Sequence, residues 1–303
     1  MLARTPELPA NSVEISSAEA LVPGGSSSSE SRSARLLRNL ELVLPVAGVV
    51  LVVLACFLGP VIFPIASPSG AGLSGSMLLP LSPGHIFGTD PLGNDILSRI
   101  LYGGRVSIEV GLGSCALGFA IGGLLGILAG FKSGATDVVV MRILDVFLSF
   151  PSLVLAIMIA TYLGASELHV IWAISFFSVP GFARLARAHT LRLREQVFIQ
   201  AARLSGTSDR RIILRHLVPN VLPSLVTFSF IFVGIAIVLE AGLSFLGLGV
   251  PPPSPTWGNM ISVGQAYLGS DPYLVLIPAA CLFLTVTCLN LAGDALRARW
   301  STA

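Results

Sequence analysis

Long apolar segments recur along the whole chain, and they constrain its fold more than any other feature. A run of about 20 apolar residues is enough for a helix to cross the hydrocarbon core of a bilayer. Six such runs occur, and they cover approximately residues 42–66, 106–131, 138–163, 168–189, 220–248 and 272–294. Because helices and closed barrels are the structures that span a bilayer, the sequence predicts an all-α, polytopic membrane protein with six transmembrane helices.

The scarcity of charge supports lipid as the surroundings of these helices. Charged residues make up 11% of the chain, whereas soluble domains carry about 25%. A soluble protein of this length needs a charged surface, which so few residues cannot form. The net charge of +2 is too small to favour nucleic acid as a partner. We therefore expect contact with membrane lipid and no contact with nucleic acid.

The chain begins with a polar segment, residues 1–39, which includes the serine run 26–29 and has no apolar periodicity. This composition predicts a disordered tail, followed by one transmembrane domain over residues 40–303. A secretory signal peptide is not expected, because the first apolar run begins only near Leu40.

The basic residues predict the orientation of the helices, since Lys and Arg in short loops are retained in the cytoplasm. With the N-terminus inside, only Arg99 and Arg105 of all the Lys and Arg residues fall in outer segments. The sequence thus predicts that both termini and residues 190–219 are cytoplasmic. Residues 67–105 and 249–271 are predicted to form external loops.

The long inner segment carries the clearest pattern of turns. Its residues predict a helix at about 197–206, which ends at Gly206 because glycine adopts the left-handed conformation of a helix C-terminus. Asp209 or one of the two residues before it is expected to cap a second helix, and Pro219 to mark the return into the membrane. A short exposed helix of this kind suits docking into a groove of another protein. A basic helix resting on lipid headgroups is the alternative.

The spacing of Gln200-Ala201-Ala202, Gly206 and Pro219 resembles the EAA loop of ABC importer permeases. In that family the loop is the coupling helix that contacts the ATP-hydrolysing subunit. The resemblance therefore implies a type I ABC importer permease fold. It places the coupling contact at the loop residues, which are Gln200, Ala201, Ala202, Arg203, Leu204 and Gly206, with Asp209 and Pro219 in the same segment. Gln200 replaces the Glu of the motif, which removes a charge from the implied contact.

Three further stretches, 85–99, 149–157 and 239–259, resemble the second permease subunit of the dipeptide and oligopeptide branch of this family. The resemblance implies import of dipeptides or oligopeptides through the bacterial cytoplasmic (inner) membrane by alternating access. It implies three kinds of protein partner: a homologous second permease, two cytoplasmic ATP-binding subunits that hold ATP and Mg, and an extracytoplasmic substrate-binding protein. Relatives that carry nickel chelates or haem leave the solute open.

Ionisable and helix-breaking residues within the apolar runs are candidates for the translocation pathway. Glu240 is the leading one, because an ionisable group in a membrane helix usually faces the bundle interior or water. A structural carboxylate is the alternative. Ser244 lies one turn further along, and Ser149 and Pro151 mark an expected kink. Arg142 and Asp145 have salt-bridge spacing.

Two remaining patterns lie in the predicted outer loops and between the helices. Trp257 is expected to anchor the chain at the membrane interface, and the acidic loop around Asp90 and Asp95 to contact a delivery protein or cap the bundle. Gly118, Gly122 and the residues around them form a small-residue face for close helix contact.

Nothing in the sequence predicts an enzyme. It has no G-x-x-x-x-G-K-[ST] phosphate loop, so ATP hydrolysis is expected on separate subunits. The four His residues are scattered, and the four Cys residues lie in apolar runs without metal-ligand spacing, so neither a cofactor nor a metal is expected in this chain. An autonomous channel or proton-coupled carrier would share the apolar runs and Glu240. The docking loop argues for the ATP-driven importer.

Overall fold

The computed structural model describes residues 32–62 and 85–301, and this part of the chain is helical apart from its turns. The chain divides into two units, Met1–Arg38 and Asn39–Ala303. The helices and helical turns are α1 (Arg32–Ile62), α2 (Ile96–Leu117), η1 (Gly118–Gly122), α3 (Gly123–Lys132), α4 (Gly134–Leu148), α5 (Ser152–Leu163), α6 (Glu167–Arg194), α7 (Val197–Leu204), α8 (Asp209–Ile212), η2 (Ile213–Leu217), α9 (Val218–Phe245), α10 (Trp257–Gly264), η3 (Gln265–Tyr267) and α11 (Tyr273–Ser301).

Five helices of the described residues are long and apolar enough to cross a membrane, and there are up to six if the bent pair α4 and α5 counts as one span. The predicted runs at 42–66, 168–189, 220–248 and 272–294 correspond to α1, α6, α9 and α11, with shifted ends. The all-helical, multi-spanning fold is therefore confirmed.

The second predicted run, 106–131, begins too late. The helix formed by α2, η1 and α3 starts ten residues earlier, at Ile96, and continues to Lys132. Asp95 caps its start by accepting a hydrogen bond from the backbone N–H of Ser98 at 2.8 Å. Arg99 lies 3.4 Å from an oxygen of Asp90, so its charge is compensated and does not end the helix.

The predicted tail and the third predicted run also differ from the structure. Residues 1–31 of the tail lie outside the described residues, but α1 already begins at Arg32, where we expected no regular structure. The third run, 138–163, is two helices that meet at an angle of 82°. Pro151 stands directly before α5 in an extended conformation, and it cannot continue the helix of α4.

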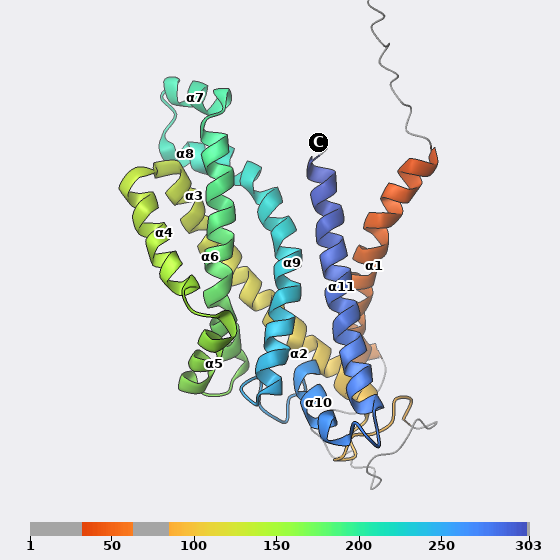
Figure 1. Ribbon diagram of the computed structural model, residues 1–303. Helices are drawn as coiled ribbons and strands as arrows, with labels where there is room; N and C mark the ends of the chain where they lie inside the picture. Colours follow the sequence, from red (N-terminus) through yellow and green to blue (C-terminus); the bar gives the residue numbers. More distant parts are fainter. Residues whose placement is uncertain (1–31, 63–84, 302–303) are drawn as a thin grey trace, which may run out of the picture. The chain divides into compact units, whose positions relative to one another are not determined.

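The segment formed by η1 and α3 packs closely against α6. A Cβ atom added at Gly118 would overlap the side chain of Ser178, and one at Gly126 would overlap the carbonyl oxygen of Ala183. Glycine is therefore required there for the two backbones to approach. At one end of the bundle lie α7 and α8, together with the C-terminal end of α11, and α10 lies at the opposite end (Figure 1).

Candidate functional site

The short helix α7 is held away from the bundle by two turns. Its C-terminus has the Schellman pattern, in which Gly206 has φ +73°. The backbone N–H of Thr207 donates to the carbonyl of Ala202 at 3.1 Å, and the N–H of Gly206 donates to that of Arg203 at 3.0 Å. The helix at Val197–Leu204 lies within the predicted range 197–206. The predicted stop at Gly206 thus has a definite hydrogen-bonding basis.

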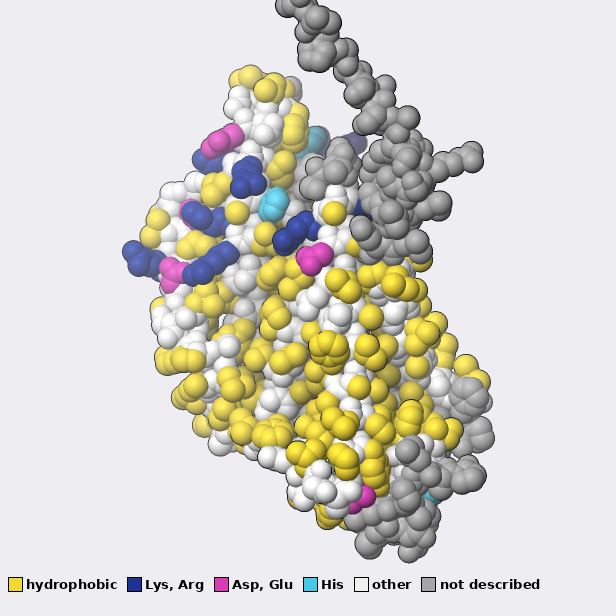
Figure 2. Space-filling view, turned by 45° about the vertical axis from the view of Figure 1, so that its right-hand side comes forward, with side chains coloured by type: hydrophobic (Ala, Val, Ile, Leu, Met, Phe, Trp, Pro, Cys, Tyr) yellow, Lys and Arg dark blue, Asp and Glu magenta, His cyan; other side chains and the backbone are white. Residues whose placement is uncertain are grey.

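The side chains of α7 divide into one anchor and an exposed apolar surface. Ile199 is fully buried, whereas Val197 is 80% exposed and Leu204 is 91% exposed. Ala201 is exposed and Ala202 is half-buried. Figure 2 shows hydrophobic side chains on the tip of the bundle, beyond a zone rich in Lys and Arg side chains. The single chain therefore leaves α7 with apolar surface that it does not cover.

Polar residues of the loop face a hollow beside α7. Arg203 lies over the ring of Phe131, with its guanidinium carbon 4.9 Å from the ring centre. Gln200 is exposed and donates from Nε2 to the carbonyl of Glu195 at 3.2 Å. Asp209, at the start of α8, lines the same hollow. Gln200, Arg203 and Asp209 of the predicted coupling set are therefore brought together.

Pro219 does not interrupt the chain as expected. It is the second residue of α9, and the helix runs without a break from Asp209 to Phe245. The wider turn η2 lies just before it, and there the N–H of Val218 bonds back to the carbonyl of Ile213. This turn accommodates a proline that has no N–H of its own to donate. The predicted turn at Pro219 is therefore wrong, while the entry into the membrane at this residue stays a prediction.

Ion pairs tie α6, which supports this loop, to α4. Arg187 donates to both carboxylate oxygens of Asp137, at 2.5 and 2.6 Å. Arg184 donates to Asp145 at 2.6 Å, so the expected pairing of Asp145 with Arg142 is wrong.

Glu240 is the centre of a second, fully buried cluster. Its two carboxylate oxygens accept hydrogen bonds from the hydroxyl of Ser107 in α2 at 2.9 Å and from that of Ser244 at 2.6 Å. The hydroxyl of Thr256 donates to the Ser244 oxygen at 3.2 Å, and the N–H of Trp257 lies 3.4 Å from the Ser107 oxygen. The cluster therefore joins α2, α9 and α10. This geometry matches the structural alternative for Glu240, since the side chain has no exposed surface.

The expected interfacial anchor, Trp257, is instead buried. Its side chain is 1% exposed, and its Nε1 donates to the carbonyl of Ile100 at 3.0 Å. Gly104 makes room for the ring, because an added Cβ at that position would touch it. The anchor prediction is therefore wrong: the indole N–H finds its acceptor inside the protein rather than at the membrane interface.

The four pathway candidates do not form one site. Ser149 and Pro151 lie at the bend between α4 and α5, where the Ser149 hydroxyl donates to the carbonyl of Asp145 at 3.0 Å. Ser244 lies in the Glu240 cluster.

In the predicted outer loop, Asp90 accepts hydrogen bonds from backbone N–H groups of its own turn, while Asp95 caps α2. These two carboxylates are occupied in holding the start of α2.

The fold resembles a solved transporter. It matches the inward-facing MetNI methionine ABC transporter with a TM-score of 0.56 and 20% sequence identity, over 66% of this chain and 95% of that chain. At this identity the likeness concerns the fold alone. Together with the membrane-spanning helices it defines the class of the protein by its fold: an all-helical protein with several candidate membrane spans.

Residues 122–302 match the model of the family described as "Binding-protein-dependent transport system inner membrane component". Two similar relatives are glutathione transport system permease proteins GsiD. The one from Escherichia coli is 46% identical over 70% of each chain. The one from Pectobacterium atrosepticum is 42% identical over 71% of this chain and 72% of that protein. The chain belongs to this family of permeases.

Family membership establishes the general role of the chain. It is a multi-pass inner-membrane permease subunit of a bacterial ABC importer and is not itself catalytic. An importer of this family is binding-protein-dependent, which implies an ATPase and a binding protein as partners. The predicted recognition is confirmed, and the autonomous channel or carrier is set aside.

Proposed function

We propose that this chain is the second permease subunit of a peptide importer, and that it transmits ATP-driven motion from α7 to the membrane helices. The peptide cargo is supported by the relatives, which are glutathione transport permeases, since glutathione is a tripeptide. Dipeptides and short oligopeptides are the proposed solutes. Nickel chelates and haem are the solutes that the test below sets against them.

The proposed coupling role rests on one observation: α7 has an exposed apolar surface, and buried residues beneath and beside it anchor this helix to the bundle. Leu204 and Val197 project from the bundle, while Ile199 below them is buried. Buried Ile212 in α8 holds the far side of the loop. An exposed short helix with fixed ends suits the helix-in-groove mode of recognition. The proposed occupant of this surface is one of two ATP-binding subunits, which hold ATP and Mg.

The concentration of Lys and Arg around α7 supports a cytoplasmic location for this end (Figure 2). The C-terminal end of α11 lies at the same end, so we place the C-terminus in the cytoplasm as well (Figure 1). The N-terminus is proposed to be cytoplasmic from the same bias of basic residues. The segment that contains α10 would then face the extracytoplasmic binding protein.

Mechanistically, closure of the ATPase subunits moves α7, and the continuous helix Asp209–Phe245 carries that motion into the bundle. A second, homologous permease supplies the other wall of the pathway. Alternation between inward-open and outward-open states then moves the peptide across. This chain contributes docking, transmission and half of the path, and the nucleotide chemistry takes place on its partners.

The test is to purify the chain with its partners from native membranes in mild detergent and reconstitute the complex in liposomes. We expect a second permease, ATP-binding subunits and a binding protein to be recovered, with ATP hydrolysis stimulated by di- and tripeptides. Matched assays use nickel chelates and haem. Stimulation by one of those and not by peptides would overturn the cargo, and recovery without ATP-binding subunits would overturn the coupling role.

A further inference from the structure

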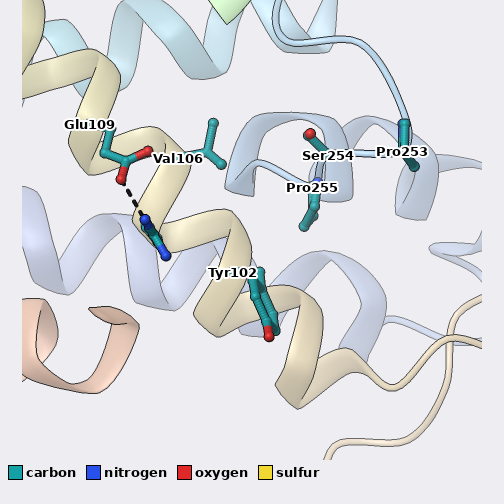
Figure 3. Close-up of a pocket in the computed structure, with 7 residues that line it drawn as sticks. Tyr102, Val106, Glu109, Pro253, Ser254 and Pro255 are labelled. Atoms are coloured by element: carbon teal, nitrogen blue, oxygen red, sulfur yellow. Dashed lines mark hydrogen bonds and ion pairs between the residues drawn. The ribbon is translucent and has the colours of Figure 1, made fainter. Parts of the chain in front are cut away.

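A small hollow lies between α2 and the segment that precedes α10. One wall is formed by residues of α2 that lie three or four positions apart and therefore share one face of the helix, namely Tyr102, Arg105, Val106 and Glu109. The other wall is the segment 253–255 (Figure 3). The cavity volume is about 260 Å³. Pockets for drug-sized ligands run from about 300 to 1,000 Å³. This hollow therefore has room for one end of a peptide rather than for a whole one.

An ion pair stands exposed at this hollow. Arg105 Nε lies 2.9 Å from Glu109 Oε1, and the two side chains are 49% and 34% exposed. The guanidinium carbon of Arg105 also lies 5.3 Å from the ring centre of Phe57, which fixes the cation from another side. Glu167, in the first turn of α6, is close enough to interact electrostatically with both. Two carboxylates thus accompany one guanidinium, so the local excess of charge is negative.

The position of this pair in a membrane helix determines what can surround it. Arg105 and Glu109 lie within the long apolar span Ile96–Lys132. Ionisable side chains in such spans face a protein interior or a water-filled cavity and not lipid. On another face of the same helix, Ser107 is already engaged with buried Glu240. The exposed pair of Arg105 and Glu109 is therefore expected to face protein or water and not lipid.

We propose that this hollow is a subsite of the translocation path, in which Glu109 binds the ammonium group at the amino end of the incoming peptide. The proposal rests on the peptide cargo proposed above. The ion pair uses one carboxylate oxygen of Glu109, and the other points toward Val106 (Figure 3). An ammonium group has three N–H donors. The Ser254 hydroxyl in the opposite wall is a further acceptor, whereas the Tyr102 hydroxyl points away from Glu109 (Figure 3).

Arg105 acts as a positioning residue in this subsite. Its contacts with Glu109 and Phe57 hold the carboxylate at one place along α2. The proline residues on either side of Ser254 restrict the opposite wall, since proline fixes its own φ angle. The hollow lies at the end of the bundle that carries α10, where the peptide would arrive from the binding protein.

The first test replaces the ligand group in the assembled, reconstituted importer. Because a hydrogen bond to a charged group is stronger than one to a neutral amide, Glu109→Gln should raise the KM for a free-amino tripeptide about tenfold or more, with little change in kcat. Glu167→Gln is the matched control, because it removes the same charge nearby without touching the lining, and its KM should change less. Equal effects of the two substitutions would overturn direct binding.

A charge exchange separates binding from support of the helix. The double variant Arg105→Glu with Glu109→Arg retains an ion pair at the same spacing on α2. If Glu109 binds the peptide, this variant should have the same high KM as Glu109→Gln. Recovery of the wild-type KM would show that the pair only stabilises the helix, and it would overturn the proposal.

The second test asks which end of the peptide is bound. Unlabelled free-amino and N-acetylated tripeptides compete with uptake of a labelled tripeptide, and the ratio of their inhibition constants is compared between wild type and Glu109→Gln. Preferences of the binding protein cancel in this comparison. We expect the variant to lose discrimination about tenfold. An unchanged ratio overturns the subsite while leaving peptide import intact, whereas absence of peptide uptake in the wild type would overturn the proposed function itself.

Access to the hollow is tested by a thiol reagent. A charged, membrane-impermeant reagent should label Val106→Cys in the assembled complex, and saturating tripeptide should slow the labelling at least severalfold. The wild type gives the background, because its native cysteines are buried or half-buried. Absence of labelling would mean that lipid or the second permease covers this face, and it would overturn the proposal.

Discussion

The loop around α7 and the cluster around Glu240 differ in how far their side chains are exposed. In α7, Leu204 and Val197 are almost fully exposed, and one buried residue, Ile199, anchors the helix. In the cluster, Glu240 is fully buried and both of its oxygens accept hydrogen bonds from the same chain. Groups that hold the fold are satisfied internally, whereas groups available to a partner remain open. Substitutions in the two regions should therefore affect different measurements.

The largest expected effect is in the buried Glu240 cluster. Glu240→Ala removes the acceptor of two buried hydroxyls, and each donor left unsatisfied costs about 1–3 kcal/mol. With the cavity added, we expect about 4 kcal/mol of lost stability, measured as a lower midpoint of thermal unfolding in detergent. Glu240→Gln is the control, since it keeps an acceptor and nearly the same volume. An unchanged midpoint for the alanine variant would contradict the structural role.

Gly206→Val should abolish transport while leaving membrane insertion intact. The residue has φ +73°, a conformation that β-branched residues essentially avoid, at a cost of about 1–2 kcal/mol or more. No atom lies within 4 Å of an added Cβ, so the effect comes from the backbone and stays local to α7. Uptake and the amount of protein in the membrane are measured together. Gly206→Asn should retain more uptake, because Asn tolerates this conformation, and equal loss in both variants would refute the explanation.

Leu204→Ala should affect association and not folding. Its side chain is 91% exposed, so stability should change by less than about 0.5 kcal/mol. If α7 docks on an ATP-binding subunit, loss of this apolar contact should weaken association about tenfold, measured by titrating the purified subunit onto the reconstituted permease. Val138→Ala, at an exposed position in α4, is the matched control. Equal affinities for the two variants would place the docking surface elsewhere.

The smallest effect is expected at Trp257, which lies at the edge of the buried Glu240 cluster. Trp257→Phe keeps most of the ring in its buried position but removes the hydrogen bond from Nε1 to the carbonyl of Ile100. A bond of this kind contributes about 1 kcal/mol. We expect a small drop in the unfolding midpoint and nearly normal uptake. A drop as large as that of Glu240→Ala would show that the indole supports the whole cluster.

The helical type of the membrane spans and the places of five of them could be predicted, because apolar runs of membrane length have few other solutions. The positions at which the helices bend or remain continuous could not be predicted. Pro151 was recognised as a kink, but the 82° turn depends on how α5 packs beside α6 and α9. Pro219 has the same local chemistry and yet lies in an unbroken helix, because the wide turn at η2 absorbs it. Local sequence does not distinguish these two outcomes.

The two candidate regions also differed in how much the sequence revealed. The stop at Gly206 depends on hydrogen bonds within one turn, so its residues are close in sequence. Glu240 bonds to Ser107, which is 133 residues away, and no local pattern connects them. Trp257 looked like an interfacial residue for the same reason: its acceptor, the carbonyl of Ile100, is supplied by a distant helix. The Arg105–Glu109 pair has a visible four-residue spacing, but its exposure required the structure.

The unbroken helix from Asp209 to Phe245 gives the molecule a mechanical property. At 1.5 Å per residue its 37 residues extend about 55 Å, which is longer than the bilayer core is thick. One end adjoins α7 and the other reaches past Glu240. Such a rod behaves as a lever, because a small tilt imposed at one end becomes a large displacement at the other. In the coupling role proposed above, this one helix and the short turn between Leu204 and Asp209 would join the docking helix α7 to the far side of the bundle.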